Sequence, residues 1–302
     1  MKRREFIKQT ASASTIIGLG GLGLAADAPK SRHITILHTN DVHSHIDPFG
    51  PDDGRNPNKG GVARRATLIN SIRKENPDTL LLDAGDIFQG TPYFNYYGGE
   101  LEFKLMSMLK YDLATIGNHD FDNGINGLYA QLPHANFSFI SANYDFSNTV
   151  LDSQVEPYKI FEKSGIRIGV FGLGIELQGL VDKTLYKETQ YLNPLEITQE
   201  MTKILKQDKQ CDLIICLSHL GYNYGTSEKV SDLTIAKNTK DIDLIIGGHT
   251  HTFLDKPTVV KNLVDEDVLV NQVGCYGINL GRIDFYFDSR KTKSAGGTSI
   301  IV

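Results

Sequence analysis

The sequence predicts a single α/β domain with mixed β-sheets. Short apolar runs typical of buried strands alternate with amphipathic helical segments between residues 33 and 246. After Phe253 the helical segments stop, and the apolar runs that follow are typical of antiparallel strands. No internal repeat and no linker divides this part of the chain, so we expect one domain.

The expected elements follow the changes in apolar spacing along the chain. We expect strands at 33–37, 79–83, 113–116, 137–142, 166–173, 213–217 and 242–246, and helices at 62–74, 101–109 and 197–206. Asn76-Pro77 ends the first of these helices. Antiparallel strands that complete a sheet are expected at 259–260, 268–273 and 283–287. Residues from Ser289 onward are expected to form a short or frayed tail.

The first 28 residues have the features of an export signal. A basic start with Arg3-Arg4 followed by Phe6 resembles a twin-arginine signal, and a generic secretory signal is the alternative. A glycine-rich apolar run, too short for a stable membrane span, ends at the small-x-small sequence Ala26-Asp27-Ala28. We expect a signal at 1–28, the main domain at 29–290 and a short tail at 291–302, in a bacterial protein that is periplasmic or secreted and has no membrane anchor once mature.

Charge and cysteine content narrow the possible functions. The net charge is −5, with no basic stripe, so extended nucleic-acid binding is not expected. An acidic protein that acts on anionic substrates needs local positive charge, and bound metal ions are an obvious source. The three cysteines are too few for a disulfide framework, and Cys211 and Cys216 flank an apolar run that favours burial.

Metal-capable side chains follow five of the expected strands. The five sets are Asp41-Val42-His43, Gly85-Asp86, Gly117-Asn118-His119, His219 and Gly248-His249-Thr250-His251, and they hold five of the nine histidines. Each set alone is weak evidence for a metal site. Residues 118–120, for example, are explained equally well by turn hydrogen bonds with a half-exposed histidine. The recurrence after five buried strands favours a metal centre at one sheet edge.

The residue types indicate which metals such a centre would hold. In an extended strand, side chains two apart share a face, so Asp41 and His43 are expected to chelate one ion. Carboxylates mixed with imidazoles, without thiolates, suit Zn, Mn or Fe. Two divalent ions about 3.5–4 Å apart are able to clamp a phosphate and activate a water.

This ordered set resembles the binuclear metallophosphoesterase superfamily. Within it, Leu37-His38-Thr39-Asn40-Asp41, the run from Asn118 to Asp122 and the closing Gly281-Arg282-Ile283-Asp284 resemble the 5′-nucleotidase family. The resemblance implies a four-layer αββα sandwich of two packed mixed sheets flanked by helices. It also implies that residues 29–290 form the catalytic domain of a metal-dependent phosphoric ester hydrolase.

The resemblance further implies a role for each matching residue. It places one metal on Asp41, His43, Asp86 and His251, and the second on the bridging Asp86 with Asn118, His219 and His249. A metal-bridging hydroxide would attack phosphorus, with Asn118 and His119 at the phosphate, His119 assisting the leaving group and Asp122 orienting His119. His251 replaces a glutamine of some relatives, and Asp120 replaces a frequent glutamate and is not expected to be catalytic.

Substrate identity stays open at this point. The usual C-terminal substrate domain of 5′-nucleotidases has no counterpart in the sequence, so specificity is either broad or completed by a separate chain. The favoured function is a nucleotide phosphomonoesterase. The alternatives are a 2′,3′-cyclic phosphodiesterase, a nucleotide-sugar hydrolase, a thiosulfohydrolase and a non-catalytic subunit of a split nucleotidase.

Some conspicuous residues receive no functional role. The aromatic cluster Tyr93, Phe94, Tyr96 and Tyr97 could line a substrate or partner surface, but ordinary loop packing is the preferred interpretation. His45 is expected to face solvent rather than phosphate, and His33, His38 and His134 are assigned no role.

Overall fold

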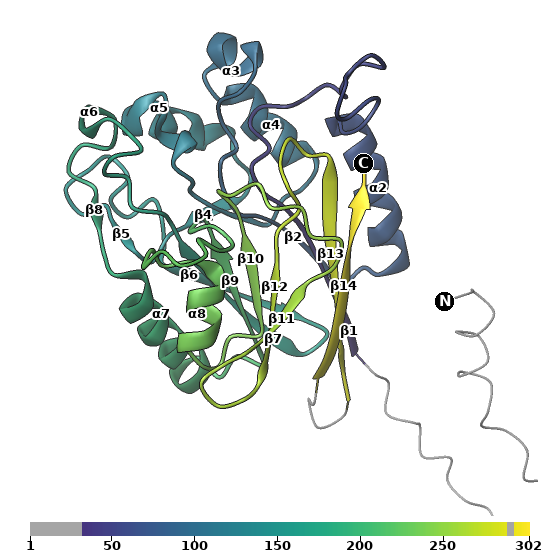
Figure 1. Ribbon diagram of the computed structural model, residues 1–302, viewed down its shortest axis with the longest axis vertical. Helices are drawn as coiled ribbons and strands as arrows, with labels where there is room; N and C mark the ends of the chain where they lie inside the picture. The colour runs from purple at the N-terminus through teal and green to yellow at the C-terminus, as the bar shows by residue number, and fades with distance from the viewer. Residues whose placement is uncertain (1–31, 289–292) are drawn as a thin grey trace, which may run out of the picture. The chain divides into compact units, whose positions relative to one another are not determined.

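The computed structural model describes residues 32–288 and 293–302, which belong to one compact unit, Ser31–Val302 (Figure 1). Two six-stranded mixed sheets form its centre. The first has the order β14 (Lys293–Ile301), β13 (Asn279–Phe287), β1 (Arg32–Thr39), β2 (Thr79–Asp83), β3 (Leu113–Thr115) and β4 (Ser138–Ile140). The second has the order β11 (Thr258–Lys261), β12 (Asp267–Asn271), β10 (Leu244–Gly247), β9 (Leu213–Ser218), β7 (Ile166–Leu173) and β6 (Tyr158–Lys163).

Both sheets have a parallel centre and antiparallel edges. Strands β1 to β4 pair in parallel, and β13 and β14 add antiparallel partners at one edge. In the second sheet β7, β9, β10 and β12 are parallel, and β6 and β11 are antiparallel edges. A third, two-stranded sheet joins β5 (Tyr144–Asp145) to β8 (Gln190–Tyr191). The parallel strands of each sheet therefore end at a common edge, where the connecting loops meet.

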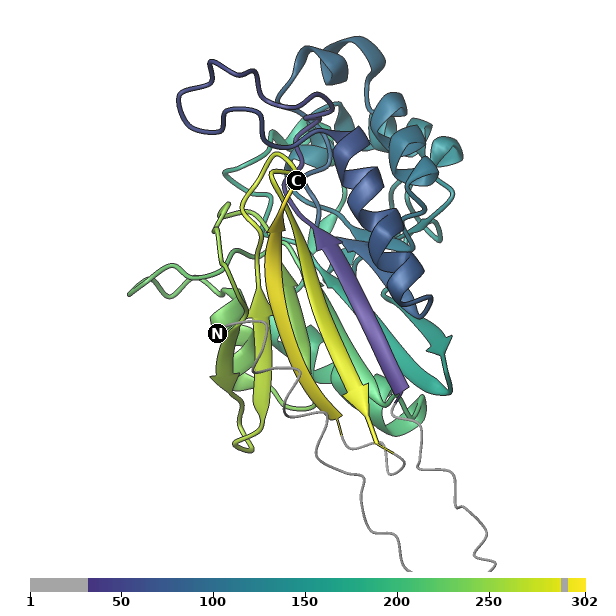
Figure 2. The same cartoon turned by 90° about the vertical axis from the view of Figure 1, so that its right-hand side faces the viewer.

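Helices cover the outer faces of the two sheets, and Figure 2 shows α2 along the face of the first sheet that is turned away from the second. The helices of the described residues are α2 (Val62–Glu75), α3 (Pro92–Tyr97), α4 (Glu100–Met108), α5 (Gly124–Gln131), α6 (Lys183–Tyr186), α7 (Pro194–Lys203) and α8 (Asp232–Asn238). Short turns complete them at η1 (His119–Phe121), η2 (Leu132–His134) and the π-helical η3 (Ile204–Asp208).

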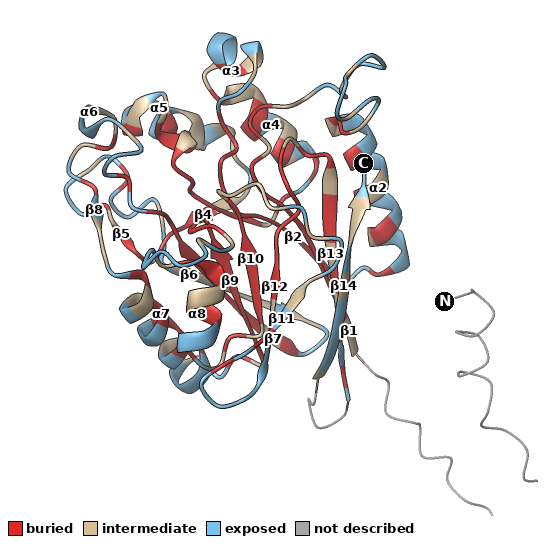
Figure 3. Ribbon diagram, in the orientation of Figure 1, coloured by how far each residue is buried: buried red, intermediate tan, exposed pale blue. Residues whose placement is uncertain are grey.

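Three apolar clusters define four layers. The first joins α2, α4 and α5 to the outer face of the first sheet, for example Ile69 and Phe103 against Leu81. The second lies between the sheets, where Leu82 and Ile36 meet Val170. The third packs α7 and α8 on the second sheet. The central strands are buried on both faces (Figure 3), which explains their continuous apolar sequence and confirms the predicted αββα class.

At the end of the chain one prediction was wrong and another holds in part. The expected tail at 291–302 includes β14, which pairs with β13 over nine residues from Lys293 to Ile301. The expected antiparallel pairing of the last strands holds for β11 with β12 and for β13 with β1 and β14, whereas β12 pairs in parallel with β10 on its other side. Strand β13 also crosses to the first sheet, where it lies beside β1. The expected signal at 1–28 lies outside the described residues.

Candidate metal centre

The seven predicted metal-capable residues lie in loops at the carboxyl ends of strands from both sheets. Asp41 and His43 follow β1, and Asp86 follows β2. The remaining members are Asn118 after β3, His219 after β9, and His249 and His251 after β10. Parallel strand ends converge at one edge, so residues up to 210 positions apart in the sequence become neighbours.

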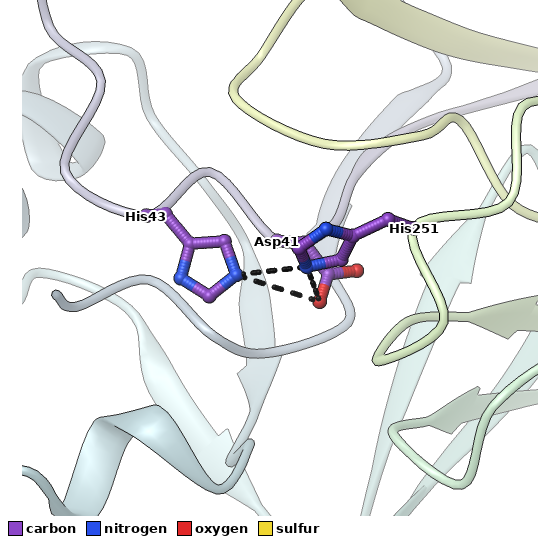
Figure 4. Close-up of side chains that lie close together, drawn as sticks. All are labelled: Asp41, His43 and His251. Atoms are coloured by element: carbon purple, nitrogen blue, oxygen red, sulfur yellow. Dashed lines mark hydrogen bonds and ion pairs between the residues drawn. The ribbon is translucent and has the colours of Figure 1, made fainter. Parts of the chain in front are cut away.

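One group consists of Asp41, His43 and His251, whose ligand atoms all lie within 4.8 Å of one another (Figure 4). The two imidazole Nε2 atoms are 3.0 Å apart. Asp41 Oδ1 lies 3.9 Å from His43 Nε2 and 3.4 Å from His251 Nε2. One carboxylate and two imidazoles facing a common point form a ligand set for a divalent metal.

A second group consists of Asp86, His219 and His249. His219 Nε2 lies 3.0 Å from Asp86 Oδ2, and His249 Nδ1 lies 2.8 Å from Asn118 Oδ1. Asp86 Oδ2 is also 3.8 Å from His43 Nε2, so this carboxylate lies between the two groups. The described residues therefore contain two adjacent candidate metal sites with Asp86 in the shared position.

Asp41 and His43 lie together as predicted, but they do not belong to an extended strand, which was the reason given for their pairing. Strand β1 ends at Thr39, and both residues have left-handed backbone, with φ of 49°. Asp86, His249 and His251 also have positive φ, at 56°, 72° and 51°. Left-handed backbone in non-glycine residues costs roughly 1–3 kcal/mol each and is concentrated at functional sites. The conformation of the loops, rather than strand alternation, therefore determines where these side chains point. His249 and His251 show this, because they are two positions apart and yet belong to different ligand groups.

Hydrogen bonds on the far side of two imidazoles fix which nitrogen faces the centre. His43 Nδ1 is 3.2 Å from the Phe88 carbonyl, and His219 Nδ1 is 2.7 Å from the Ala84 carbonyl. A carbonyl accepts only, so each Nδ1 carries the proton and each Nε2 presents a lone pair. His219 Nε2 is fully buried and has no hydrogen-bond partner. A buried lone pair beside a carboxylate fits a metal ion, so the residues present suit the group.

The two central carboxylates are held in place by backbone amides. Both oxygens of Asp41 are 3.0 Å from the His249 amide, and Asn40 Nδ2 donates to Asp41 Oδ2 at 2.6 Å. The His119 amide donates to Asp86 Oδ1 at 2.8 Å. Burial raises the pKa of Asp86, but the surrounding imidazoles outweigh burial and hold this pKa below its usual range. The Asp86 carboxylate is thereby kept ionised, as a metal ligand must be.

His119 lies beside the two groups but belongs to neither. Its Nδ1 is 2.8 Å from Asp122 Oδ2, and its ring centroid is 5.2 Å from that of His43. The hydrogen bond to Asp122 raises the pKa of His119, and the side chain of His119 remains 40% exposed. An exposed, carboxylate-held imidazole next to a candidate metal centre has the properties of a proton donor.

Sequence reasoning missed two residues that shape the centre. Asp120 is fully buried, and its carboxylate accepts four backbone N–H bonds, from residues 86, 87, 88 and 117. Buried Gln272 accepts from Thr252 N and Thr250 Oγ1 and donates to the Gly248 carbonyl, which fixes the loop that carries His249 and His251. Asp120 was visible inside the motif, whereas nothing in the sequence pattern distinguished Gln272.

The structure also places the aromatic residues at 93–97 and His45, which were assigned no functional role. Phe94 is buried in the core beside Phe88, whereas Tyr96 of α3 is 82% exposed. The predicted packing therefore holds for Phe94 and fails for Tyr96. His45 is not simply solvent-facing, because its ring lies 4.3 Å from that of Tyr276 and 5.1 Å from that of Phe49.

This fold, with carboxylates and imidazoles of two adjacent metal sites at converging strand ends, defines a class of metal-dependent hydrolases. The family model described as calcineurin-like phosphoesterase matches residues 34–253. The chain therefore belongs to the calcineurin-like phosphoesterase family.

Similar proteins carry nucleotide-related names. The trifunctional nucleotide phosphoesterase YfkN of Bacillus subtilis is 35% identical over 298 residues, which are 87% of this chain and 19% of that protein. The snake venom 5′-nucleotidase of Crotalus adamanteus is 34% identical over 305 residues, 91% of this chain and 49% of that protein. The solved structure of a Thermus thermophilus 5′-nucleotidase precursor has a TM-score of 0.81 and 33% identity, with 90% of this chain and 55% of that chain covered. The chain thus spans about half the length of these nucleotidases.

Proposed function

We propose that this domain hydrolyses phosphate monoesters with two divalent metal ions and that its substrate is a 5′-nucleotide. The observation that carries the proposal is the pair of adjacent ligand groups that share Asp86, with His119 beside them. The first ion is assigned to Asp41, His43, Asp86 and His251, and the second to Asp86, Asn118, His219 and His249. The names of the similar proteins support the choice of a nucleotide.

When bound, the two ions supply positive charge to the phosphoryl oxygens and lower the pKa of the water that acts as nucleophile. Asn118 and His119 face the phosphate from the β3 loop. His119 binds Asp122 through Nδ1, which leaves Nε2 to donate a proton to the oxygen of the leaving group. Asp122 fixes the orientation of the imidazole and stabilises its protonated form. Carboxylate and imidazole ligands suit Mn, Zn or Fe.

Release of phosphate from p-nitrophenyl phosphate tests the reaction class. Purified protein loaded with Mn or Zn should turn over this ester, and excess chelator should abolish turnover. His119→Ala should reduce kcat about 10²–10⁴-fold, which is typical of losing a general acid, and should retain metal by elemental analysis. His134→Ala, in η2, is the matched control. Full activity of His119→Ala would overturn the assigned role, and chelator-resistant turnover would overturn the reaction class.

A substrate panel tests the nucleotide assignment. The panel compares 5′-nucleotides with 2′,3′-cyclic nucleotides, nucleotide sugars, thiosulfate-linked substrates and simple phosphate esters, each with Mn and with Zn. A 5′-nucleotide should give the highest kcat/KM. A separate chain that completes the substrate site is a further proposal. High nucleotide selectivity by purified protein that elutes as a monomer would argue against such a partner.

Export is proposed from residues 1–28. In the part of the chain that the structure describes, no helix is both long and apolar enough to cross a membrane. Replacing both arginines of the twin-arginine pair by lysine, Arg3→Lys with Arg4→Lys, should retain the protein in the cytoplasm of a bacterial host. Fractionation and immunoblotting measure this. Unchanged export would favour a generic secretory signal instead.

A further inference from the structure

A small cavity lies beside the loop that follows β1, between helices α2 and α4 and the end of β2. Its volume is about 20 Å³. An internal water needs about 10–15 Å³, so the cavity has the size of a single water site. Within the described part of the chain, neither ligand group contributes a lining residue. The wall is largely apolar, and its polar side chains are Ser44, His45, Arg65, Asp83, Glu102 and Tyr111.

Two charged side chains on this wall have atoms without a hydrogen-bond partner. Among the described residues, Nε and Nη1 of Arg65 and Oε2 of Glu102 are buried and unpartnered. Arg65 is 4% exposed and Glu102 is 5% exposed. The guanidinium group stays charged at any pH at which the protein is folded, and a buried polar atom that lacks a partner costs free energy. A single partner shared across the cavity would satisfy both side chains.

The other carboxyl group on the wall already has partners. Asp83 accepts from Thr39 Oγ1 at 2.5 Å and from the backbone amide two positions later at 2.9 Å. The Tyr111 hydroxyl lies 2.8 Å from Thr39 Oγ1. Burial raises the pKa of Asp83 to about 7, and the positive charge of Arg65 opposes this effect. The hydrogen bonds still to be made in this cavity are therefore those of Arg65 and Glu102.

Glu102 connects the cavity to the loop that carries the first ligand group. Its Oε1 accepts from Ser44 Oγ, and Ser44 directly follows His43. Ser44 has left-handed backbone, with φ of 59°, and its amide donates to the Ile87 carbonyl at 2.9 Å. The His43 amide donates to the Asp86 carbonyl at 3.0 Å. The Ser44 side chain thus fixes, through Glu102, the backbone that presents His43.

Arg65 contacts a second segment beside the same ligand group. A Cβ atom at Gly277 would clash with Arg65 Nη1, so the guanidinium group packs directly on this turn. The amide of Tyr276, one position earlier, donates to the Asp41 carbonyl at 2.7 Å. Helix α2 therefore reaches, through Arg65, the turn that holds the backbone of Asp41.

Charge and size together select the occupant of this cavity. Two carboxyl groups on the wall disfavour an anion, and the guanidinium group of Arg65 disfavours a cation. The small volume excludes larger molecules. A water molecule is neutral, both donates and accepts, and inside proteins typically makes about three hydrogen bonds to buried polar groups. Water is therefore able to accept from Arg65 and to donate to Glu102 Oε2.

We propose that an internal water joins Arg65 to Glu102 and that this bridge positions the His43 loop through Ser44. Arg65 and Glu102 are then positioning residues, since neither belongs to a ligand group. The water site is independent of the proposed hydrolysis, whereas the positioning of His43 rests on the proposed metal centre. The bridge links α2 and α4, on the outer face of the first sheet, to the loop that presents His43.

A high-resolution crystal structure of the metal-free protein tests the water site. We expect electron density for one water within hydrogen-bond distance of both the Arg65 guanidinium group and Glu102 Oε2. A cavity without such density, or a direct ion pair between Arg65 and Glu102, would overturn the bridge.

Urea denaturation of metal-free variants tests whether the two side chains act as a pair. Arg65→Leu and Glu102→Val each leave the other charged group buried alone, so each should lower the urea midpoint. The double variant replaces both groups by apolar side chains and should recover most of this loss. The matched control is Arg64→Leu with Glu100→Val, which changes more exposed neighbours on the same two helices and should have little effect. Losses that simply add in the double variant would contradict the pairing.

Titration of the metal-free protein with Co²⁺, followed by visible absorption, tests the positioning role. Glu102→Val should weaken the binding of one ion about tenfold, at the low end of the effects of groups that orient metal ligands. Glu102→Gln keeps an acceptor for Ser44 and should bind Co²⁺ as the unmodified protein does. The double variant of Arg65 and Glu102 still lacks that acceptor, so its Co²⁺ affinity should stay low even though its stability recovers.

The Co²⁺ titration also separates this inference from the proposed function. Equal affinity in Glu102→Val and the unmodified protein, or an affinity that recovers together with stability in the double variant, would overturn the positioning role. If the unmodified protein bound no Co²⁺, the metal centre itself would be wrong and the positioning role would fall with it. The crystal structure and the urea measurements would still decide the water bridge, because neither requires a metal ion.

Discussion

Asp120 is the residue whose contacts most directly organise the centre. Its carboxylate lies 2.8–3.1 Å from four backbone nitrogens in the loops that carry Asp86 and Asn118. In Asp120→Asn an amide group would face N–H donors and leave some of them unsatisfied in a buried position. We expect a loss of about 2–4 kcal/mol in the free energy of unfolding. Urea denaturation of the metal-free protein measures the change.

The matched control for this prediction is Asp152→Asn, because Asp152 is exposed. This variant should lie within about 0.5 kcal/mol of the unmodified protein. Metal content should also fall in Asp120→Asn, since the loop that presents Asp86 loses its anchor. An Asp120→Asn protein of unchanged stability and metal content would show that the four hydrogen bonds do not position Asp86.

At this scale the sequence could predict which residues meet but not how they are held. Positions after buried strands were enough to select Asp41, Asp86 and His219, because parallel strand ends converge. The left-handed backbone of Asp41 and His249 was not predictable, since neither residue type requires it and the surrounding contacts impose it. The role of Gln272 depends on hydrogen bonds to a loop more than 20 positions earlier.

Among the elements, the buried strands were predictable, whereas the edge strands β6 and β14 were not. The predicted bounds of β2 and β7 match the structure, because strands covered on both faces read as continuous apolar runs. Strand β14 has the sequence KSAGGTSII, which has no apolar alternation, and pairing with β13 holds it in the sheet. The six- to eight-residue helices α3, α5 and α8 are too short to establish a helical period.

The pairing of β1 with β13 predicts a pH-dependent contribution to stability. Asp284 on β13 accepts from Thr35 Oγ1 at 2.6 Å and from Arg282 Nε at 2.8 Å, and it lies 2.8 Å from His33 Nε2. Burial raises the pKa of Asp284, but these hydrogen bonds outweigh burial and lower it overall. Because the pKa of Asp284 is lower in the folded than in the unfolded protein, its ionised form stabilises the fold at pH values above the unfolded-state pKa of about 4. This stabilisation is lost as pH falls through the folded-state pKa.

Asp284→Asn should therefore cost roughly 1 kcal/mol at pH 7, a value reduced by solvent screening at this partly exposed site. The difference from the unmodified protein should shrink as pH falls below about 4, and it should approach zero only once pH is below the lowered folded-state pKa of Asp284, where the carboxyl is protonated in both the folded and the unfolded protein. Urea midpoints measured at pH 7 and at a series of pH values below about 4 test this. The control Asp267→Asn removes an exposed ion pair with Lys261 and should change little at any of these pH values. A pH-independent cost for Asp284→Asn would contradict the electrostatic explanation.

At the scale of the whole molecule, the candidate centre joins the two sheets. Asp41, Asp86 and Asn118 come from the first sheet, and His219 and His249 come from the second. Each ligand group contains residues from both sheets. A bound ion would therefore connect the two halves of the sandwich, and its binding free energy would stabilise the folded domain as a unit.

Removal of metal should therefore lower the melting temperature of the entire domain in one transition. An ion present at 1,000 times its Kd stabilises the fold by about 4 kcal/mol, which corresponds to roughly 8–16 °C for a domain of this size. Differential scanning calorimetry with and without chelator, followed by re-addition of Mn or Zn, measures the shift. The shift should vanish in the double variant His43→Ala, His219→Ala, which removes one ligand from each group. A melting temperature that stays constant while bound metal falls to zero would mean that the two sheets hold the ligands in place without help from the ions.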